Sequence, residues 1–140
     1  MPLYLYLISH DRPEIKTHTY IGCTENFLRR LNQHNGFEAG GPRITKRAAG
    51  SWEPIIIIKI PDDSTLNSKD LKKEWKQSSR GLESRIRRGL EIAVNNQLQL
   101  VMPKNKNNNI PIVKFINDNW DGDTVNMTNQ QWKRVLSSEL

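Results

Sequence analysis

The chain has 140 residues, of which 36% are hydrophobic and 26% charged, and its 21 Lys and Arg outnumber its 15 Asp and Glu to give a net charge of +6. This length predicts one domain with a hydrophobic core, and the composition excludes a fibrous or collagen-like chain. The longest strictly apolar run, residues 55–58, is far shorter than the ~18 to 20 residues of a membrane-spanning helix, which excludes an integral membrane protein. Basic residues gather at residues 29–47 and again at 80–88, a clustering that favours a polyanionic partner.

The cysteine content and the N-terminal residues indicate the cellular localisation. Cys23 is the only cysteine, so an internal disulfide is impossible and zinc sites made of four cysteines are excluded. The N-terminal residues lack the basic segment that begins a secretory signal peptide. We therefore expect an intracellular protein, nuclear or cytoplasmic according to its source, that is not secreted and has no membrane partner.

The chain is predicted to begin with a hairpin. Residues 3–9 alternate and mix aromatic with aliphatic side chains, which indicates a strand, and residues 19–22 indicate a second one. The polar stretch between them predicts an antiparallel pair joined by a long loop. Gly22 marks a point where the backbone bends or lies close to a neighbour.

A basic amphipathic helix and a basic loop are expected to follow. Thr24 is predicted to cap a helix over about residues 25–33, and Gly36 to end it. Residues 37–50 combine glycine with basic side chains, which indicates a mobile, ligand-facing loop or a short helix around residues 44–49.

A central strand and two further helices are predicted next. Pro54 precedes residues 55–60, whose nearly unbroken apolar run is typical of a strand covered on both faces. Helices are expected over residues 68–77 and 82–96, with Gly81 between them.

The C-terminal part gives weaker signals. The Asn-rich residues 104–109 predict an exposed loop, and residues 110–116 predict an edge strand. The capping-box pattern at residues 128–131 predicts a short final helix.

Side chains suited to phosphate chemistry lie close together in this predicted arrangement. Tyr6 and Tyr20 lie on adjacent strands, and the next helix carries Arg30 and His34 four residues apart, on one face. Each feature alone is more typical of core packing or of a solvated helix. The spacing of the four residues along the chain is more informative than any one of them.

This spacing resembles the signature of the GIY-YIG nuclease family. Thirteen residues separate Tyr6 from Tyr20, which begins the motif Tyr-Ile-Gly, and Arg30 and His34 follow ten and fourteen residues after Tyr20. The run Arg-Arg-Leu-Asn-Gln-His-Asn-Gly at residues 29–36 is the most specific part of the match.

Further motifs point to one branch of that family. The runs Gly-Gly-Pro-Arg-Ile-Thr at residues 40–45 and Leu-Lys-Lys-Glu-Trp at residues 71–75 are similar to the eukaryotic structure-selective enzymes that cut flaps and Holliday junctions. The likeness covers roughly residues 4–78. Two departures are clear: Tyr4 stands where the first motif has glycine, and the cysteines of that branch's zinc domain are missing from this sequence.

The resemblance implies a fold and an organisation. The fold is an α/β (α+β) domain with a small three-stranded antiparallel sheet flanked by helices. This nuclease domain would occupy residues 1–96, and residues 97–140 would form a C-terminal extension packed on the same domain.

The resemblance also implies an activity. It is that of a metal-dependent DNA endonuclease that hydrolyses phosphodiester bonds, structure-selective for flaps, forks and junctions in DNA repair or recombination. The expected cofactor is one Mg²⁺ or Mn²⁺ ion and the expected partner is DNA, whereas a homodimer or a scaffold protein stays open.

Position by position, the resemblance implies five catalytic residues. Glu74 would hold the metal ion, since hard cations prefer oxygen ligands, and Arg30 would make bidentate bonds to the phosphoryl oxygens. Tyr6 or Tyr20 would orient or deprotonate the attacking water, with Tyr6 the favoured base and Tyr20 a positioning partner. His34 would share that role or bind phosphate.

Some alternatives remain open at this level. Glu83, on the next predicted helix, is a rival to Glu74 as the acid. Basic side chains expected to contact the DNA backbone are Arg29, Arg43, Lys46 and Arg47. A sequence-specific homing or restriction nuclease, a catalytically silent nucleic-acid-binding protein on the same fold, and RNA as substrate are the competing functional interpretations.

Overall fold

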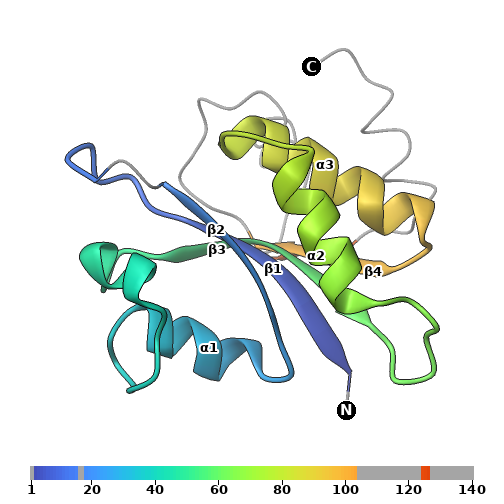
Figure 1. Ribbon diagram of the computed structural model, residues 1–140, viewed down its shortest axis with the longest axis horizontal. Helices are drawn as coiled ribbons and strands as arrows, with labels where there is room; N and C mark the ends of the chain where they lie inside the picture. The colour runs from blue at the N-terminus through green and yellow to red at the C-terminus, as the bar shows by residue number, and fades with distance from the viewer. Residues whose placement is uncertain (1, 16–17, 104–123, 127–140) are drawn as a thin grey trace.

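The computed structural model describes residues 2–15, 18–103 and 124–126 (Figure 1). Within them, five strands form one sheet in the order β2-β1-β3-β4-β5, with every neighbouring pair antiparallel. The strands are β1 Leu3–Ser9, β2 Thr19–Thr24, β3 Glu53–Ile60, β4 Gln99–Pro103 and β5 Thr124–Asn126. The helices are α1 Phe27–His34, the 3-10 helix η1 Arg43–Ala48, α2 Ser68–Gln77 and α3 Leu82–Asn95.

The predicted fold class is confirmed, but the expected strand number was wrong. The sheet is antiparallel and flanked by helices, and it has five strands among the described residues rather than three. β4 was missed because its pattern is short: Leu100 and Met102 are buried, but only a few residues separate them from the end of α3. The predicted edge strand at residues 110–116, the Asn-rich loop and the final helix lie outside the described residues.

β3 is the central strand, as its apolar run predicts. It pairs with β1 on one side and with β4 on the other. Ile55, Ile56 and Ile58 are fully buried, because helices cover both faces of the sheet at this point.

The helices lie in two layers (Figure 1). α1 and η1 cover one face of the sheet, which we call the α1 face, and α2 and α3 cover the other, which we call the α3 face. The main hydrophobic core lies on the α3 face, where Leu5 and Leu7 of β1 meet Trp75 of α2 and Leu90 of α3. A smaller cluster lies on the α1 face and includes Tyr6, Ile8, Ala48 and Trp52.

The predicted α2 has the expected bounds, whereas α1 begins later than predicted. Asn26, not Thr24, caps α1, because its Oδ1 accepts a hydrogen bond from the backbone N–H of Arg29 at 3.1 Å. The hydroxyl of Thr24 instead accepts from the N–H of Asn26 at 3.2 Å, which turns the chain before the helix starts. β2 accordingly extends to Thr24, two residues past Gly22.

The two helices of the α3 face pack closely at one glycine. A Cβ at Gly89 of α3 would lie 2.6 Å from the Trp75 ring of α2, so only glycine lets the helix approach this side chain. None of the helices in the described segments is long and apolar enough to cross a membrane.

Candidate active site

Tyr6 lies at the centre of the α1 face because of its partner on β2. In the register of β1 and β2, Tyr6 is opposite Gly22, and a Cβ built on Gly22 would lie 2.2 Å from the Tyr6 hydroxyl. The Tyr6 ring therefore occupies space that any other residue at position 22 would fill. The glycine of the Tyr-Ile-Gly motif thus sets where the hydroxyl of the first tyrosine lies.

A chain of buried hydrogen bonds starts at the Tyr6 hydroxyl. It lies 2.7 Å from Nε2 of His34, and Nδ1 of His34 lies 3.0 Å from Oγ1 of Thr45. Thr45 in turn donates its hydroxyl proton to the carbonyl of Pro42 at 3.0 Å. Tyr6, His34 and Thr45 are each no more than 1% exposed, so water does not compete for these bonds.

The direction of these bonds fixes the tautomer of His34. The single hydroxyl proton of Thr45 is used on Pro42, so Oγ1 of Thr45 can only accept from His34. His34 therefore carries its proton on Nδ1, and its Nε2 accepts from the Tyr6 hydroxyl. The oxygen of Tyr6 consequently keeps its lone pairs for another donor.

Burial holds both groups of this pair neutral. It raises the pKa of Tyr6 above its usual value, although the Arg30 guanidinium opposes the rise. Burial also lowers the pKa of His34 to about 4, and the positive charge of Arg30 acts in the same direction. At neutral pH, His34 is therefore a neutral imidazole that can accept a proton.

Arg30 is held beside this pair by the end of α1. Its Nη1 donates to Oε1 of Gln33 at 2.8 Å and to the carbonyl of Gly40 at 3.2 Å. The guanidinium also lines a surface hollow of about 480 Å³ beside the end of β2. Arg30 is thus fixed in orientation while one side of it faces a space that a phosphate can enter.

Tyr20 lies on the same face at the sheet edge. Its ring centroid is 6.3 Å from that of Tyr6 and 4.7 Å from that of His34. It is half-buried and lines a cavity of about 520 Å³, with Nζ of Lys76 5.7 Å from its ring centroid. Burial lowers the pKa of Lys76. Of the two tyrosines, Tyr20 is therefore the one nearer to solvent.

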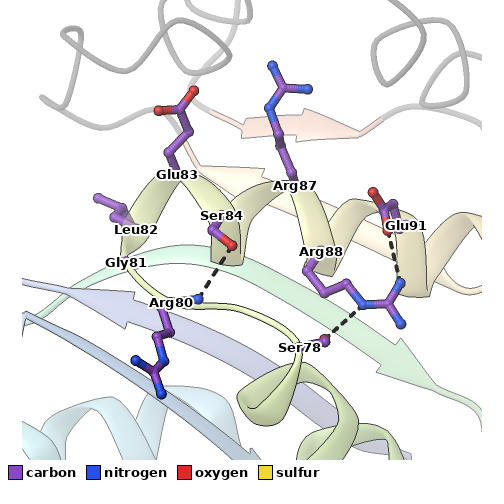
Figure 2. A pocket seen from close by; sticks show the side chains of 9 residues that line it. All are labelled: Ser78, Arg80, Gly81, Leu82, Glu83, Ser84, Arg87, Arg88 and Glu91. Atoms are coloured by element: carbon purple, nitrogen blue, oxygen red, sulfur yellow. Dashed lines mark hydrogen bonds and ion pairs between the residues drawn. The ribbon is translucent and has the colours of Figure 1, made fainter.

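Glu74 is not brought together with these four residues. It lies on α2, on the α3 face, and its carboxylate accepts a hydrogen bond from Nη2 of Arg88 on α3. Arg88 also bonds Glu91 and Ser78, and Figure 2 shows Glu83, the rival acid, pointing away from the sheet. The two acids proposed from the sequence thus both lie on the α3 face.

A metal ion beside Tyr6 and His34 would need oxygen ligands on the α1 face. A carboxylate with water and phosphate oxygens suits a hard cation, and Glu74 supplies that donor type. In the structure, however, this carboxylate is paired with Arg88 on the face opposite Tyr6, and within residues 2–15 and 18–103 no group of three His, Cys, Asp or Glu is placed to hold a metal. The arrangement therefore does not fit an ion held by Glu74 at the Tyr6–His34 pair, and the metal role of Glu74 stays a prediction.

The basic side chains predicted to contact DNA lie around the α1 face. Arg43, Lys46 and Arg47 are exposed on η1, the helix that also supplies Thr45. Arg29 is exposed on α1 and forms an ion pair with Glu38 at 2.9 Å. An exposed pair of this kind is weak, so it does not prevent Arg29 from binding phosphate.

Sequence reasoning missed the role of Thr45. Residues 37–50 were expected to form a mobile, ligand-facing loop or a short helix around residues 44–49, and the short helix is present as η1. It is anchored, because Thr45 bonds His34 and the Trp52 indole N–H donates to the carbonyl of Thr45 at 2.9 Å. Thr45 lies eleven residues after His34 in a separate helix, so no helical or strand period relates the two positions. The only signal was its place in the run Gly-Gly-Pro-Arg-Ile-Thr.

The chain is similar to known proteins over the residues that carry the candidate site. Residues 2–85 match the family described as "GIY-YIG catalytic domain". The chain is 35% identical over 89 residues to the structure-specific endonuclease subunit SLX1 homolog of Leishmania infantum, covering 63% of this chain and 12% of that protein. It is 35% identical over 60 residues to the structure-specific endonuclease subunit slx1 of Xenopus laevis, covering 42% of this chain and 21% of that protein.

A fungal relative is similar over a shorter stretch. The structure-specific endonuclease subunit slx1 of Talaromyces marneffei is 51% identical over 41 residues, covering 29% of this chain and 10% of that protein. The chain thus spans only 10% to 21% of the length of these three relatives.

The family match includes every residue of the candidate site. Its span, residues 2–85, contains the two strands with the tyrosines, α1 and α2. The domain is a nuclease domain, and nucleases that contain it generally depend on a divalent metal ion. The resemblance predicted from the spacing of Tyr6, Tyr20, Arg30 and His34 is confirmed: the chain belongs to the GIY-YIG catalytic-domain family.

Proposed function

We propose that this chain is a metal-dependent DNA endonuclease that hydrolyses phosphodiester bonds, selecting branched DNA such as flaps, forks and junctions in repair or recombination. The observation that carries the proposal is the buried hydrogen-bonded chain from Tyr6 through His34 to Thr45, with Arg30 beside it. The curated relatives are named structure-specific endonuclease subunits, which supports the choice of substrate.

Tyr6 is proposed to take the proton of the attacking water. Because its own proton is donated to Nε2 of His34, the Tyr6 oxygen can accept from water while its hydroxyl proton passes to the imidazole. The water then attacks phosphorus as hydroxide, the bond between phosphorus and the 3′ oxygen breaks, and the leaving 3′ oxygen takes a proton from solvent. Tyr6 stays protonated, and His34 becomes an imidazolium. No free tyrosinate forms, which matters because burial raises the pKa of Tyr6.

Arg30 is proposed to stabilise the negative charge that develops on the phosphoryl group. Its planar guanidinium can donate two hydrogen bonds to non-bridging oxygens, a geometry that lysine does not reproduce. The same negative charge offsets the cost of the buried imidazolium of His34. Tyr20, nearer to solvent, is proposed to position the water.

The metal ion is proposed to be Mg²⁺ or Mn²⁺. Both are hard cations that bind carboxylate, water and phosphate oxygens, the donors that an acidic side chain and a nucleic-acid substrate bring together. Glu74 is the proposed ligand on the strength of the sequence resemblance, and binding the ion would require its carboxylate to leave Arg88.

The test is a cleavage assay with labelled duplex, 5′-flap, fork and four-way-junction DNA, each with Mg²⁺, with Mn²⁺ and with EDTA. We expect cutting near branch points with metal and none with EDTA. Cutting at one duplex sequence would support a homing or restriction nuclease instead, and tight binding without cutting under any condition would support the catalytically silent protein.

Two variants distinguish a metal-binding role of Glu74 from a structural one. If Glu74 holds the ion, Glu74→Gln abolishes cutting and leaves DNA affinity unchanged. Arg88→Gln, which frees the carboxylate of Glu74, then leaves cutting intact or lowers the metal concentration it needs. If Glu74 only holds the two helices together through Arg88, both variants lower thermal stability and neither changes the metal dependence.

A further inference from the structure

The cavity beside Tyr20 joins the two layers of the molecule at the edge of β2. It has a volume of about 520 Å³ and is lined by Ile44 of η1 on one side of the sheet and by Lys76 of α2 and Arg85 of α3 on the other. Thr19 and Tyr20 of β2 form its floor between them. None of the described residues that line it is acidic.

The positive charge at this cavity is not neutralised by the described part of the chain. Nη1 of Arg85 donates to the hydroxyl of Thr19 at 2.9 Å, a neutral partner. The buried Nε–H of Arg85 donates to no partner, and no other buried side-chain nitrogen or oxygen in residues 2–15 and 18–103 is left unpaired. No carboxylate within those residues pairs with Arg85 or Lys76.

A second basic cavity, along the outside of α3, shows the contrast. It has a volume of about 660 Å³ and is the one drawn in Figure 2. There, Arg88 is paired with both Glu74 and Glu91, and Glu83 also lines the wall. That cavity carries its own counter-ions, whereas the cavity beside Tyr20 is left cationic.

We propose that the cavity beside Tyr20 binds a backbone phosphate of the nucleic-acid strand, adjacent to the phosphate at Tyr6 and Arg30, through Lys76 and Arg85. The inference rests on the proposed function and adds two binding residues to it. Ile44, 54% exposed at the rim, supplies apolar contact to the sugar or base of that nucleotide. The bound strand then crosses the edge of β2 from the α1 face to the α3 face.

The first experiment measures how DNA affinity depends on salt. The protein is the full chain with Tyr6→Phe, so that the probe, a fluorescent 5′-flap DNA, stays intact, and Lys76→Gln and Lys76→Gln/Arg85→Gln are added to it. The logarithm of the association constant falls as the logarithm of the salt concentration rises. Each lost phosphate contact is expected to make this fall less steep by about 0.7 to 0.9 and to weaken binding about tenfold at 0.1 M salt. Lys73→Gln, on the same helix but away from the cavity, is the matched control.

The second experiment places the phosphate. Single phosphates around the cleavage site are replaced one at a time by uncharged methylphosphonate. We expect one position next to the cut to weaken binding of the Tyr6→Phe protein about tenfold and to have no effect once Lys76 and Arg85 are both replaced. Two milder variants control for a loss of folding. Arg85→Lys keeps the charge, and Lys76→Gln alone changes only an exposed side chain.

The outcomes are separable from those of the proposed function. If the cavity variants match Lys73→Gln in affinity and salt slope, or if the protein binds no branched DNA, the inference is overturned, whatever the cleavage assay shows. If their affinity and slope fall as expected while the parent chain cuts no substrate, the phosphate site stands and the nuclease proposal fails.

Discussion

The two faces of the sheet are built from different kinds of side chain. On the α1 face, Tyr6, His34 and Thr45 are buried and joined by hydrogen bonds, and an arginine lies beside them. On the α3 face, the main cluster is made of aliphatic side chains, Met102 and Trp75, and Arg88 lies outside it, paired with Glu74 and Glu91. One strand, β1, supplies alternate residues to both faces.

The difference shows how a small domain separates stability from chemistry. The α3 face carries the larger apolar cluster, and apolar burial is the main source of stability. The α1 face instead buries polar groups, which is favourable only when every one of them is satisfied. Tyr6, His34 and Thr45 satisfy one another there in the hydrogen-bonded chain that we assign to proton transfer.

The largest effect is expected from the arginine of the α1 face. Arg30→Ala removes a charged donor that we place on the phosphoryl oxygens, so we expect cleavage to slow by about 100- to 1,000-fold, and Arg30→Lys to restore little of it. Single-turnover rates on branched DNA measure this. Arg87→Ala on α3 is the control for lost charge, and an equal loss in both variants would remove the distinction between the faces.

The next effect is a pH dependence of stability that comes from the buried histidine. The pKa of His34 is lowered to about 4 from 6.5, so the unfolded chain binds this proton first as the pH falls. The contribution is fully present above about pH 6.5 and is lost as the pH falls towards 4, with a total of about 3 kcal/mol.

Urea unfolding at several pH values checks this dependence. Wild type and His34→Gln are compared, because the variant keeps all other titrating groups. We expect the gap in unfolding free energy to shrink by about 3 kcal/mol between pH 6.5 and pH 4. A gap that does not change with pH would mean that His34 is not held neutral by its surroundings.

A smaller effect is expected at the far end of the hydrogen-bonded chain. Thr45→Val leaves the Nδ1–H of His34 buried without an acceptor, which costs about 1 to 3 kcal/mol of stability. Thr45→Ser keeps the hydroxyl and should lose much less. Thermal melts of the two variants give the comparison; equal losses would mean that the hydrogen bond contributes no more to stability than the methyl group that Thr45→Ser removes.

The smallest effect is expected at the exposed rim of the α1 face. Lys46→Ala and Arg47→Ala should each weaken binding to all DNA substrates by about tenfold at 0.1 M salt and flatten the salt dependence. They should leave the cleavage rate of bound DNA unchanged. Fluorescence anisotropy over a salt series measures both quantities, and unchanged affinity would remove η1 from the DNA-binding surface.

Most helices and strands, and the pair of tyrosines, could be predicted from the sequence because the patterns that indicate them are local. The alternation of residues 3–9, the run at residues 55–60 and the spacing from Tyr6 to His34 each lie within one element or one motif. β4 was missed because its pattern is too short to stand out. These elements also place the tyrosines, Arg30 and His34 on one face.

The remaining parts depend on tertiary contacts that no sequence period encodes. Thr45 reaches His34 across a loop, and the pairing of Glu74 with Arg88 spans fourteen residues and two helices. The cationic cavity beside Tyr20 needs η1, α2 and α3 to meet at one sheet edge. The sequence placed Glu74 beside the lysines of a helix, but not on the face opposite the tyrosines.

The most direct test of the central claim compares two tyrosines of the same strand. Tyr4 and Tyr6 lie two residues apart on β1 and differ in that only the Tyr6 hydroxyl is known to bond His34. We expect Tyr6→Phe to slow single-turnover cleavage of branched DNA at least about 100-fold with unchanged affinity, more than Tyr20→Phe does, and Tyr4→Phe to have little effect. A Tyr6→Phe protein that cuts as fast as Tyr4→Phe would contradict the assignment of proton transfer to the Tyr6–His34 pair.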